Sequence, residues 1–212
     1  MTDIGYSAFK DCTNLTSITI SNSVTDIGFA AFEGCTGLTS IIIPNSVSNI
    51  NLWTFKKCTN LTSITIPNNV TSIGSQAFYE CNSLKTMTIK VNKDLEIGKN
   101  IFEKSSLEEL IMSGETLPKS ADEDFADGFY DTTTLYVPFS QYEEYHSTSP
   151  WSKFKNIVII DVETTGISNQ EPWSPNASSI YNINGGKVGN STLNSGLYIK
   201  KGKKYVVKQT AI

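Results

Sequence analysis

The sequence repeats itself every 23 residues, and this period constrains the fold more than any other feature. Four successive units begin at Ile4, Ile27, Ile50 and Ile73, and their apolar residues stay in register through each unit. A repeat of this length is typical of solenoids, in which each unit forms one coil and buries its apolar side only against its neighbours. The other columns in register are Phe9, Phe32, Phe55 and Phe78; Cys12, Cys35, Cys58 and Cys81; Leu15, Leu38, Leu61 and Leu84; Ile18, Ile41, Ile64 and Met87; and Ile20, Ile43, Ile66 and Ile89.

Each unit contains one short segment in which apolar and polar residues alternate. In the first unit, residues 17–20 place Ile18 and Ile20 on one face and hydroxyl side chains on the other. This alternation predicts a half-buried strand. A proline ends the strand in two units, at Pro44 and Pro67, because proline cannot extend a hydrogen-bonded ladder from its nitrogen.

The Ile-Gly-x-x-Ala-Phe segment, which the third unit replaces with Ile-Asn-Leu-Trp-Thr-Phe, is expected to form a second wall of the coil. Its Ile, Ala and Phe point inward, and its glycine permits a tight corner at Gly5, Gly28 and Gly74. Coils with two apolar walls must stack, so their strands form a parallel sheet with neighbours about 4.8 Å apart. The predicted fold class is therefore α/β and strand-dominated, a solenoid with a parallel sheet.

The repeat pattern decays toward the C-terminus, and the chain divides into four regions. The solenoid is expected over residues 1–138, with about six coils and an incomplete N-terminal coil. Residues 139–163 are expected to cap the open edge of the sheet, and residues 164–179, rich in Ser, Thr, Asn and Pro, form a linker. A small β module with Gly-containing turns is expected over residues 180–212.

The cap combines a helix signal with large apolar side chains. Ser140 and Glu143 have the spacing of a capping box, in which each side chain hydrogen bonds to the backbone N–H of the other residue, and this predicts a short helix over residues 139–145. Trp151 and Phe154 follow, and they can cover the apolar edge of the sheet.

The repeat unit resembles a known family. Its pattern, Ile-Gly-x-x-Ala-Phe-x-x-Cys-Thr-x-Leu-Thr-Ser-Ile-x-Ile-Pro-Asn-x-Val, is similar to the BspA-like leucine-rich repeat of the Treponema pallidum type over residues 4 to about 112. The resemblance implies a right-handed leucine-rich-repeat solenoid with a C-terminal cap and a small β appendage. It also implies a secreted or cell-surface bacterial protein, some of whose relatives are adhesins. Residues 180–208 resemble the C-terminal module of many Bacteroidetes surface proteins, which implies a sorting or anchoring segment.

Composition excludes two classes of interaction. The net charge is -4, and no Lys-rich stripe occurs outside the last dozen residues, so nucleic acid is not an expected partner. No run approaches the ~20 apolar residues of a membrane-spanning helix. Residues 1–20 lack the order of a signal peptide, and we expect an upstream portion because Met1 falls partway through a repeat. A monomer without a transmembrane segment is expected.

Few residues in the sequence have the chemistry for catalysis or metal binding. His146 is the single histidine and has no nearby Cys or His, so a solvated surface side chain is expected. The acidic run over residues 122–128 resembles a calcium loop, but Ala126 and Thr133 stand where ligands are required. We therefore expect no enzyme, no catalytic residue, no metal and no cofactor.

The four cysteines could form two disulfides in an exported protein, yet their spacing favours free thiols. Each cysteine occupies the same place on successive coils, so its side chain points parallel to its neighbours rather than toward them. The coil spacing of about 4.8 Å alone would fit a disulfide. The favoured prediction is an inward ladder of thiols that act as small apolar groups.

Two surfaces are candidate binding sites. One is the outward face of the strands, and the other is an aromatic flank at the non-core positions of the Ile-Gly-x-x-Ala-Phe segment. A solvated Ser/Thr ladder and a shielded seam between coils are the corresponding structural alternatives. The strand positions are Ser17, Thr19, Ser40, Ile42, Ser63, Thr65, Thr86 and Thr88, continued by Glu109, Ile111 and Tyr136, and the flank consists of Tyr6, Phe29, Leu52 and Trp53.

These features predict a non-catalytic recognition or adhesion module at the surface of a bacterium or outside the cell. Its expected partner is an extracellular protein or glycan from a host or another bacterium. The alternative is a structural spacer within a larger surface protein.

Overall fold

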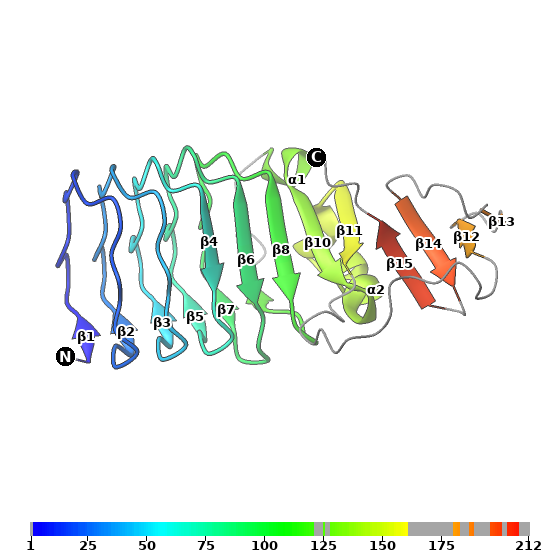
Figure 1. Cartoon of the computed structure of the whole chain (residues 1–212), viewed down its shortest axis with the longest axis horizontal. Coiled ribbons are helices and arrows are strands. Elements are labelled where there is room, and N and C mark those ends of the chain that lie inside the picture. The colour runs from blue at the N-terminus through cyan, green and yellow to red at the C-terminus, as the bar shows by residue number, and fades with distance from the viewer. Residues whose placement is uncertain are drawn as a thin grey trace. The chain divides into compact units, whose positions relative to one another are not determined.

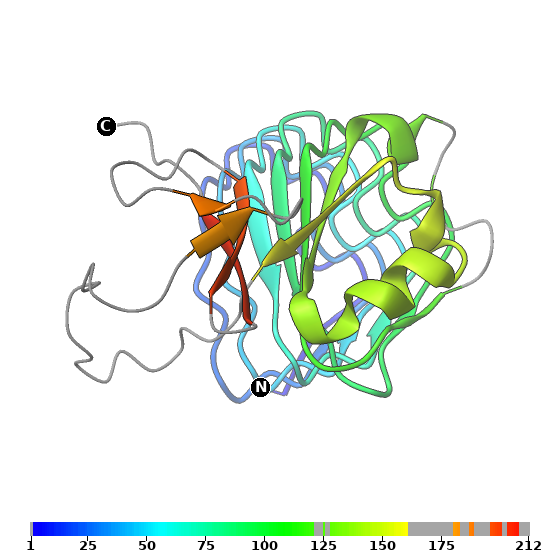
Figure 2. The ribbon, with the colours of Figure 1, turned by 90° about the vertical axis from the view of Figure 1, so that its right-hand side faces the viewer.

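The computed structural model contains stacked coils over its first compact unit, Met1–Val158, as the 23-residue period predicts (Figure 1). Seen along the stack, successive coils lie behind one another and the cap helices lie across the last coil (Figure 2). The predicted linker lies outside the described residues, and so does the acidic run except for Phe125 and Gly128. The structure describes residues 2–120, 125, 128–160, 180–182, 187–188, 196–200 and 203–207.

The first wall is a parallel sheet of six two-residue strands in the order β1-β2-β3-β5-β7-β9. Equivalent positions pair along the sheet, so that Ile4 lies opposite Ile27 and Ile27 opposite Ile50. These isoleucines are buried, which confirms the predicted inward wall. The strands are β1 (Asp3–Ile4), β2 (Asp26–Ile27), β3 (Asn49–Ile50), β5 (Ser72–Ile73), β7 (Glu96–Ile97) and β9 (Lys119–Ser120).

The second wall is a five-stranded sheet in the order β11-β10-β8-β6-β4. Its strands alternate as predicted: in β4, Ile64 and Ile66 are buried whereas Ser63 and Thr65 are exposed. The register from β4 to β8 is parallel and pairs equivalent repeat positions. The strands are β4 (Ser63–Ile66), β6 (Thr86–Lys90), β8 (Glu109–Ser113), β10 (Thr134–Pro138) and β11 (Asn156–Ile160).

The corner glycines have a different role from the predicted one. A Cβ at Gly74 would lie 2.4 Å from the backbone nitrogen of Leu52, and one at Gly28 would lie 3.0 Å from the backbone of the preceding coil. Glycine therefore allows close stacking. The left-handed backbone lies two residues after these glycines, where Ala30 and Gln76 both have φ 54°.

The core consists of columns that run through successive coils. Phe9, Phe32, Phe55 and Phe78 stack with ring centroids 5.2–5.5 Å apart. The same column continues through Phe102 into the cap, where Phe125 and Phe129 stack on it. One continuous aromatic stack thus joins the solenoid to its cap.

The cysteines form the predicted ladder of free thiols. The Sγ atoms of Cys35, Cys58 and Cys81 each donate a hydrogen bond to a phenylalanine carbonyl of the preceding coil, at 3.0–3.2 Å. Burial raises the pKa of the Cys35 thiol to about 11 and that of the Cys81 thiol to about 12. These thiols are therefore protonated near neutral pH.

The cap contains the predicted aromatic cover, but the predicted capping box is wrong. Residues 139–141 form a 3-10 turn, so the α-helix begins after Gln141, which makes no side-chain cap hydrogen bond. The 3-10 turn therefore places Ser140 one residue before the N-cap position. Trp151 and Phe154 are buried. The elements are α1 (Phe129–Thr132), η1 (Phe139–Gln141), α2 (Tyr142–Ser147) and η2 (Trp151–Lys153).

The second compact unit, Ile159–Ile212, contains a four-stranded antiparallel sheet in the order β13-β12-β14-β15. Its strands agree with the β module predicted there. None of the helices in the described residues has the length and apolar character needed to cross a membrane. The strands are β12 (Ile180–Asn182), β13 (Lys187–Val188), β14 (Gly196–Lys200) and β15 (Lys203–Val207).

Candidate functional site

The outward strand positions lie where the alternation predicts, and Tyr136 differs from the others in its low exposure. Tyr136 is only 9% exposed, and its hydroxyl hydrogen bonds to Glu109 on the neighbouring strand β8. Tyr136 therefore stands at an outward position of β10, but little of its ring is exposed. Ser17, Thr19, Ser40, Ile42, Ser63 and Thr65 are exposed, and Thr86, Thr88, Glu109 and Ile111 are half-buried.

The regular sheet begins only at β4. In the two preceding coils, residues 17–20 and 40–43 share a single isolated parallel bridge, between Thr19 and Ile42. β4 is the edge strand of its sheet, so no ladder joins it to residues 40–43 in the described chain. The second wall is thus interrupted between the second and third coils, although the repeat pattern treats these coils as equivalent.

A hollow of about 460 Å³ opens at this interruption. Its volume lies in the range of about 300–1,000 Å³ that is usual for ligand sites. Ile42 is 82% exposed and stands where the neighbouring coils carry Thr19 and Thr65. The hollow therefore brings together four of the predicted contact residues. It is lined by Ser40, Ile41, Ile42, Ile43, Asn45, Ser63, Ile64, Thr65, Pro67 and Lys90.

The charge of the hollow comes from Lys90 at the end of β6. Among the described residues that line it, none is acidic. Lys90 takes part in none of the ion pairs between described residues, whereas Lys85, just before β6, pairs with Glu108. Sequence reasoning did not select Lys90. The sequence does mark this residue, because Lys90 stands at the repeat position that Pro44 and Pro67 occupy in the two preceding coils.

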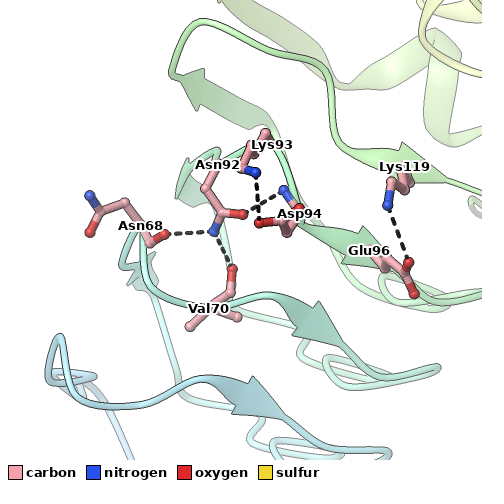
Figure 3. A network of polar contacts seen from close by, with 7 residues as sticks. All are labelled: Asn68, Val70, Asn92, Lys93, Asp94, Glu96 and Lys119. Atoms are coloured by element: carbon pink, nitrogen blue, oxygen red, sulfur yellow. Dashed lines mark hydrogen bonds and ion pairs between the residues drawn. The ribbon is translucent and has the colours of Figure 1, made fainter.

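A polar network holds the corner that follows Lys90 (Figure 3). The Asn92 side chain donates hydrogen bonds to the carbonyl oxygens of Asn68 at 2.6 Å and Val70 at 2.7 Å, and it accepts one from the Asp94 N–H at 2.9 Å. The bond to Asn68 repeats the one that the Asn69 side chain, 23 residues earlier, donates to the carbonyl oxygen of Asn45. The other two bonds are added at Asn92 and hold the backbone two residues beyond Lys90.

The aromatic side chains of the flank contact one another and residues of neighbouring coils. Tyr6, 74% exposed, stacks on Phe29 with ring centroids 4.9 Å apart. Trp53 is half-buried, and its indole N–H donates to the Gln76 side chain at 2.7 Å. The Lys56 Nζ lies 4.0 Å from the centroid of the Trp53 ring. The Trp53 indole therefore packs at the seam between coils, whereas most of the Tyr6 side chain is exposed to solvent.

A buried carboxylate on the same flank escaped the sequence analysis. Glu33 is 8% exposed and lies 2.9 Å from the Lys10 Nζ and 3.4 Å from the Lys56 Nζ. Burial would raise its pKa, but the two lysines together hold that pKa below its ordinary value. The signal was available, because Lys10, Glu33 and Lys56 are spaced by 23 residues and alternate in charge. This ion-pair column has a structural role.

The single histidine lies outside any cluster of metal-binding side chains in the described part of the chain. His146 is exposed and lies beside the Tyr142 ring, with centroids 5.6 Å apart. Within the described residues, no three His, Cys, Asp or Glu side chains are grouped as a metal site requires.

Comparison with solved structures shows the same architecture in bacterial proteins. A leucine-rich-repeat protein from Treponema pallidum is 31% identical with a TM-score of 0.50, and the match covers 52% of this chain and 52% of that chain. The pneumococcal vaccine antigen PcpA is 22% identical with a TM-score of 0.63, over 76% of this chain and 40% of that chain. A leucine-rich cell surface protein from Faecalibacterium prausnitzii is 19% identical with a TM-score of 0.41, over 80% of this chain and 66% of that chain.

The matched region thus spans about half of the Treponema protein and two fifths of PcpA. No curated protein matches the sequence. The family model for the BspA type leucine-rich repeat region matches in six copies over residues 2–127, which is more than half of the chain. The chain therefore belongs to the BspA-type leucine-rich-repeat family, whose members are usually non-catalytic binding proteins.

Proposed function

We propose that the protein is a non-catalytic recognition or adhesion module at the bacterial cell surface, and that its partner is an extracellular macromolecule. Membership of a family of binding proteins supports this function. The observation that carries it is the position of Ile42. This side chain is 82% exposed and lines a hollow, at a position where the neighbouring coils carry the hydroxyl groups of Thr19 and Thr65. A partner that covers it would gain the free energy of apolar burial.

A consensus substitution separates binding from folding at this site. Ile42→Thr installs the residue found at positions 19, 65 and 88, so the fold should be unchanged. The matched control is Ile111→Thr, which changes the same column outside the hollow. If a partner covers most of Ile42, its loss should weaken binding about tenfold, since burial of such a side chain is worth about 1.5–3 kcal/mol.

The experiment is a screen of the intact chain against arrays of matrix proteins and glycans, followed by titration of each retained ligand with the two variants. We expect a tenfold weaker Kd for Ile42→Thr alone, with equal melting temperatures. Equal losses for both variants would contradict the assignment to the hollow. If neither array retains a ligand, the result would favour the alternative function, a structural spacer within a larger surface protein.

We further propose that residues 180–212 act as a sorting or anchoring module, of the kind found in Bacteroidetes surface proteins. Its four-stranded sheet belongs to a compact unit separate from the solenoid, which supports an independent role. Deletion of residues 180–212 should leave the circular dichroism of the solenoid intact and reduce the protease-accessible fraction on whole cells. An unchanged accessible fraction would contradict this role.

A further inference from the structure

We propose that the hollow binds an extended peptide segment that carries a carboxylate, and that Lys90 pairs with this carboxylate. The inference rests on the proposed function and names the ligand class of the same site. Three properties of the hollow support it: its floor, its walls and its charge.

The floor of the hollow includes backbone. Ile41, Ile43 and Ile64 line it, yet these residues are only 4–6% exposed because their side chains lie in the core. Their exposed atoms are therefore mainly backbone atoms. An inter-coil hydrogen bond from Thr62 to Thr39 precedes the hollow, and no ladder follows between residues 40–43 and β4 in the described chain. An extended peptide supplies both donors and acceptors for backbone groups on this floor.

The walls of the hollow suit a peptide better than a sugar. The hydroxyls of Ser40, Ser63 and Thr65 can each donate and accept, and Ile42 offers an apolar contact to a ligand side chain. Among the described lining residues none is aromatic, so the ring platform on which sugars stack is missing. β4 has four residues, or about 13 Å at about 3.3 Å per residue, which matches about four residues of extended ligand.

Lys90 provides the charge selectivity. It lines the hollow, is exposed, and has no acidic partner among the described residues, in a protein whose net charge is -4. The Asn92 network holds the backbone beyond it. A carboxylate at that end of the hollow would pair with Lys90 without displacing an existing ion pair, whereas a ligand lysine there would be repelled.

The test uses the intact protein and a library of linear seven-residue peptides whose central residue is Asp, Glu, Asn, Gln or Lys. We expect the Asp and Glu pools to bind the wild type about five- to tenfold more tightly than the Asn and Gln pools. Lys90→Gln should remove this preference and leave the melting temperature unchanged. Lys85→Gln is the matched control, because Lys85 flanks the same strand outside the hollow and pairs with Glu108.

A double-mutant cycle decides the pairing. Lys90→Gln should raise the Kd of a selected Asp peptide about five- to tenfold and leave the Kd of its Asn counterpart unchanged. Equal effects on both peptides, or equal losses with Lys85→Gln, would overturn the role of Lys90. Ligands retained only on a glycan array would overturn the peptide assignment while the recognition function stands. An absence of ligands on every array would overturn both.

Discussion

The continuous phenylalanine column makes a quantitative prediction about the solenoid. Phe55 is fully buried and stacks between Phe32 at 5.5 Å and Phe78 at 5.4 Å. Phe55→Ala should lower the free energy of unfolding by about 4 kcal/mol, within the usual range of about 3–5 kcal/mol for such truncations. For a protein of this size, the melting temperature should fall by about 8–16 °C, at about 2–4 °C per kcal/mol.

Phe9→Ala is the matched comparison, because it removes the same side chain from the first coil. Phe9 is half-buried and stacks on Phe32 alone. Its truncation should cost about half as much, since each coil is stabilised only by its neighbours. Urea unfolding followed by far-UV circular dichroism measures both losses. A loss below about 1 kcal/mol for Phe55→Ala, or one no larger than that for Phe9→Ala, would refute a continuous column of coupled rings.

Three further predictions concern buried polar groups. Unfolded thiols ionise near pH 8.5, whereas burial raises the pKa of Cys81 to about 12, so stability should fall by about 2 kcal/mol per such thiol between pH 8 and 10. Cys81→Ala should reduce this loss of stability by about 2 kcal/mol, which urea unfolding at pH 8 and pH 10 measures. The depressed pKa of Glu33 contributes stability that is present above pH ~4.3 and lost on acidification, so Glu33→Gln should flatten the decline between pH 5 and pH 3. Asn92→Ala should cost about 1–3 kcal/mol in thermal unfolding and more than Asn69→Ala, which loses one exposed bond rather than three.

The sequence predicts the walls and core of the solenoid because each coil contacts only its neighbours. A residue such as Cys58 meets its equivalents in the coils on either side, so the period alone determines that its thiol is buried and parallel to theirs. The same logic correctly places Ile64 inside and Thr65 outside. Where this equivalence holds, pattern and structure agree.

Features that break the equivalence of coils were harder to predict. The strand sequences of the second and third coils, residues 40–44 and 63–67, differ only by Ile42 in place of Thr65. No propensity distinguishes them, yet the ladder stops between them. The same limit applies at the cap, where the 3-10 turn shifts the helix start past Ser140. Local patterns do not specify such shifts, because neighbouring elements determine them.

The regularity of the scaffold also determines where specificity can vary. A substitution in an inward column disturbs two neighbouring coils, whereas one in an outward column changes only the surface. Ile42 and Lys90 are departures of the second kind: one replaces an exposed hydroxyl, and the other extends β6 where proline ended the equivalent segments. Neither requires the core to change. Binding at the hollow should therefore be separable from folding, which is what the paired variants at these positions and at their controls measure.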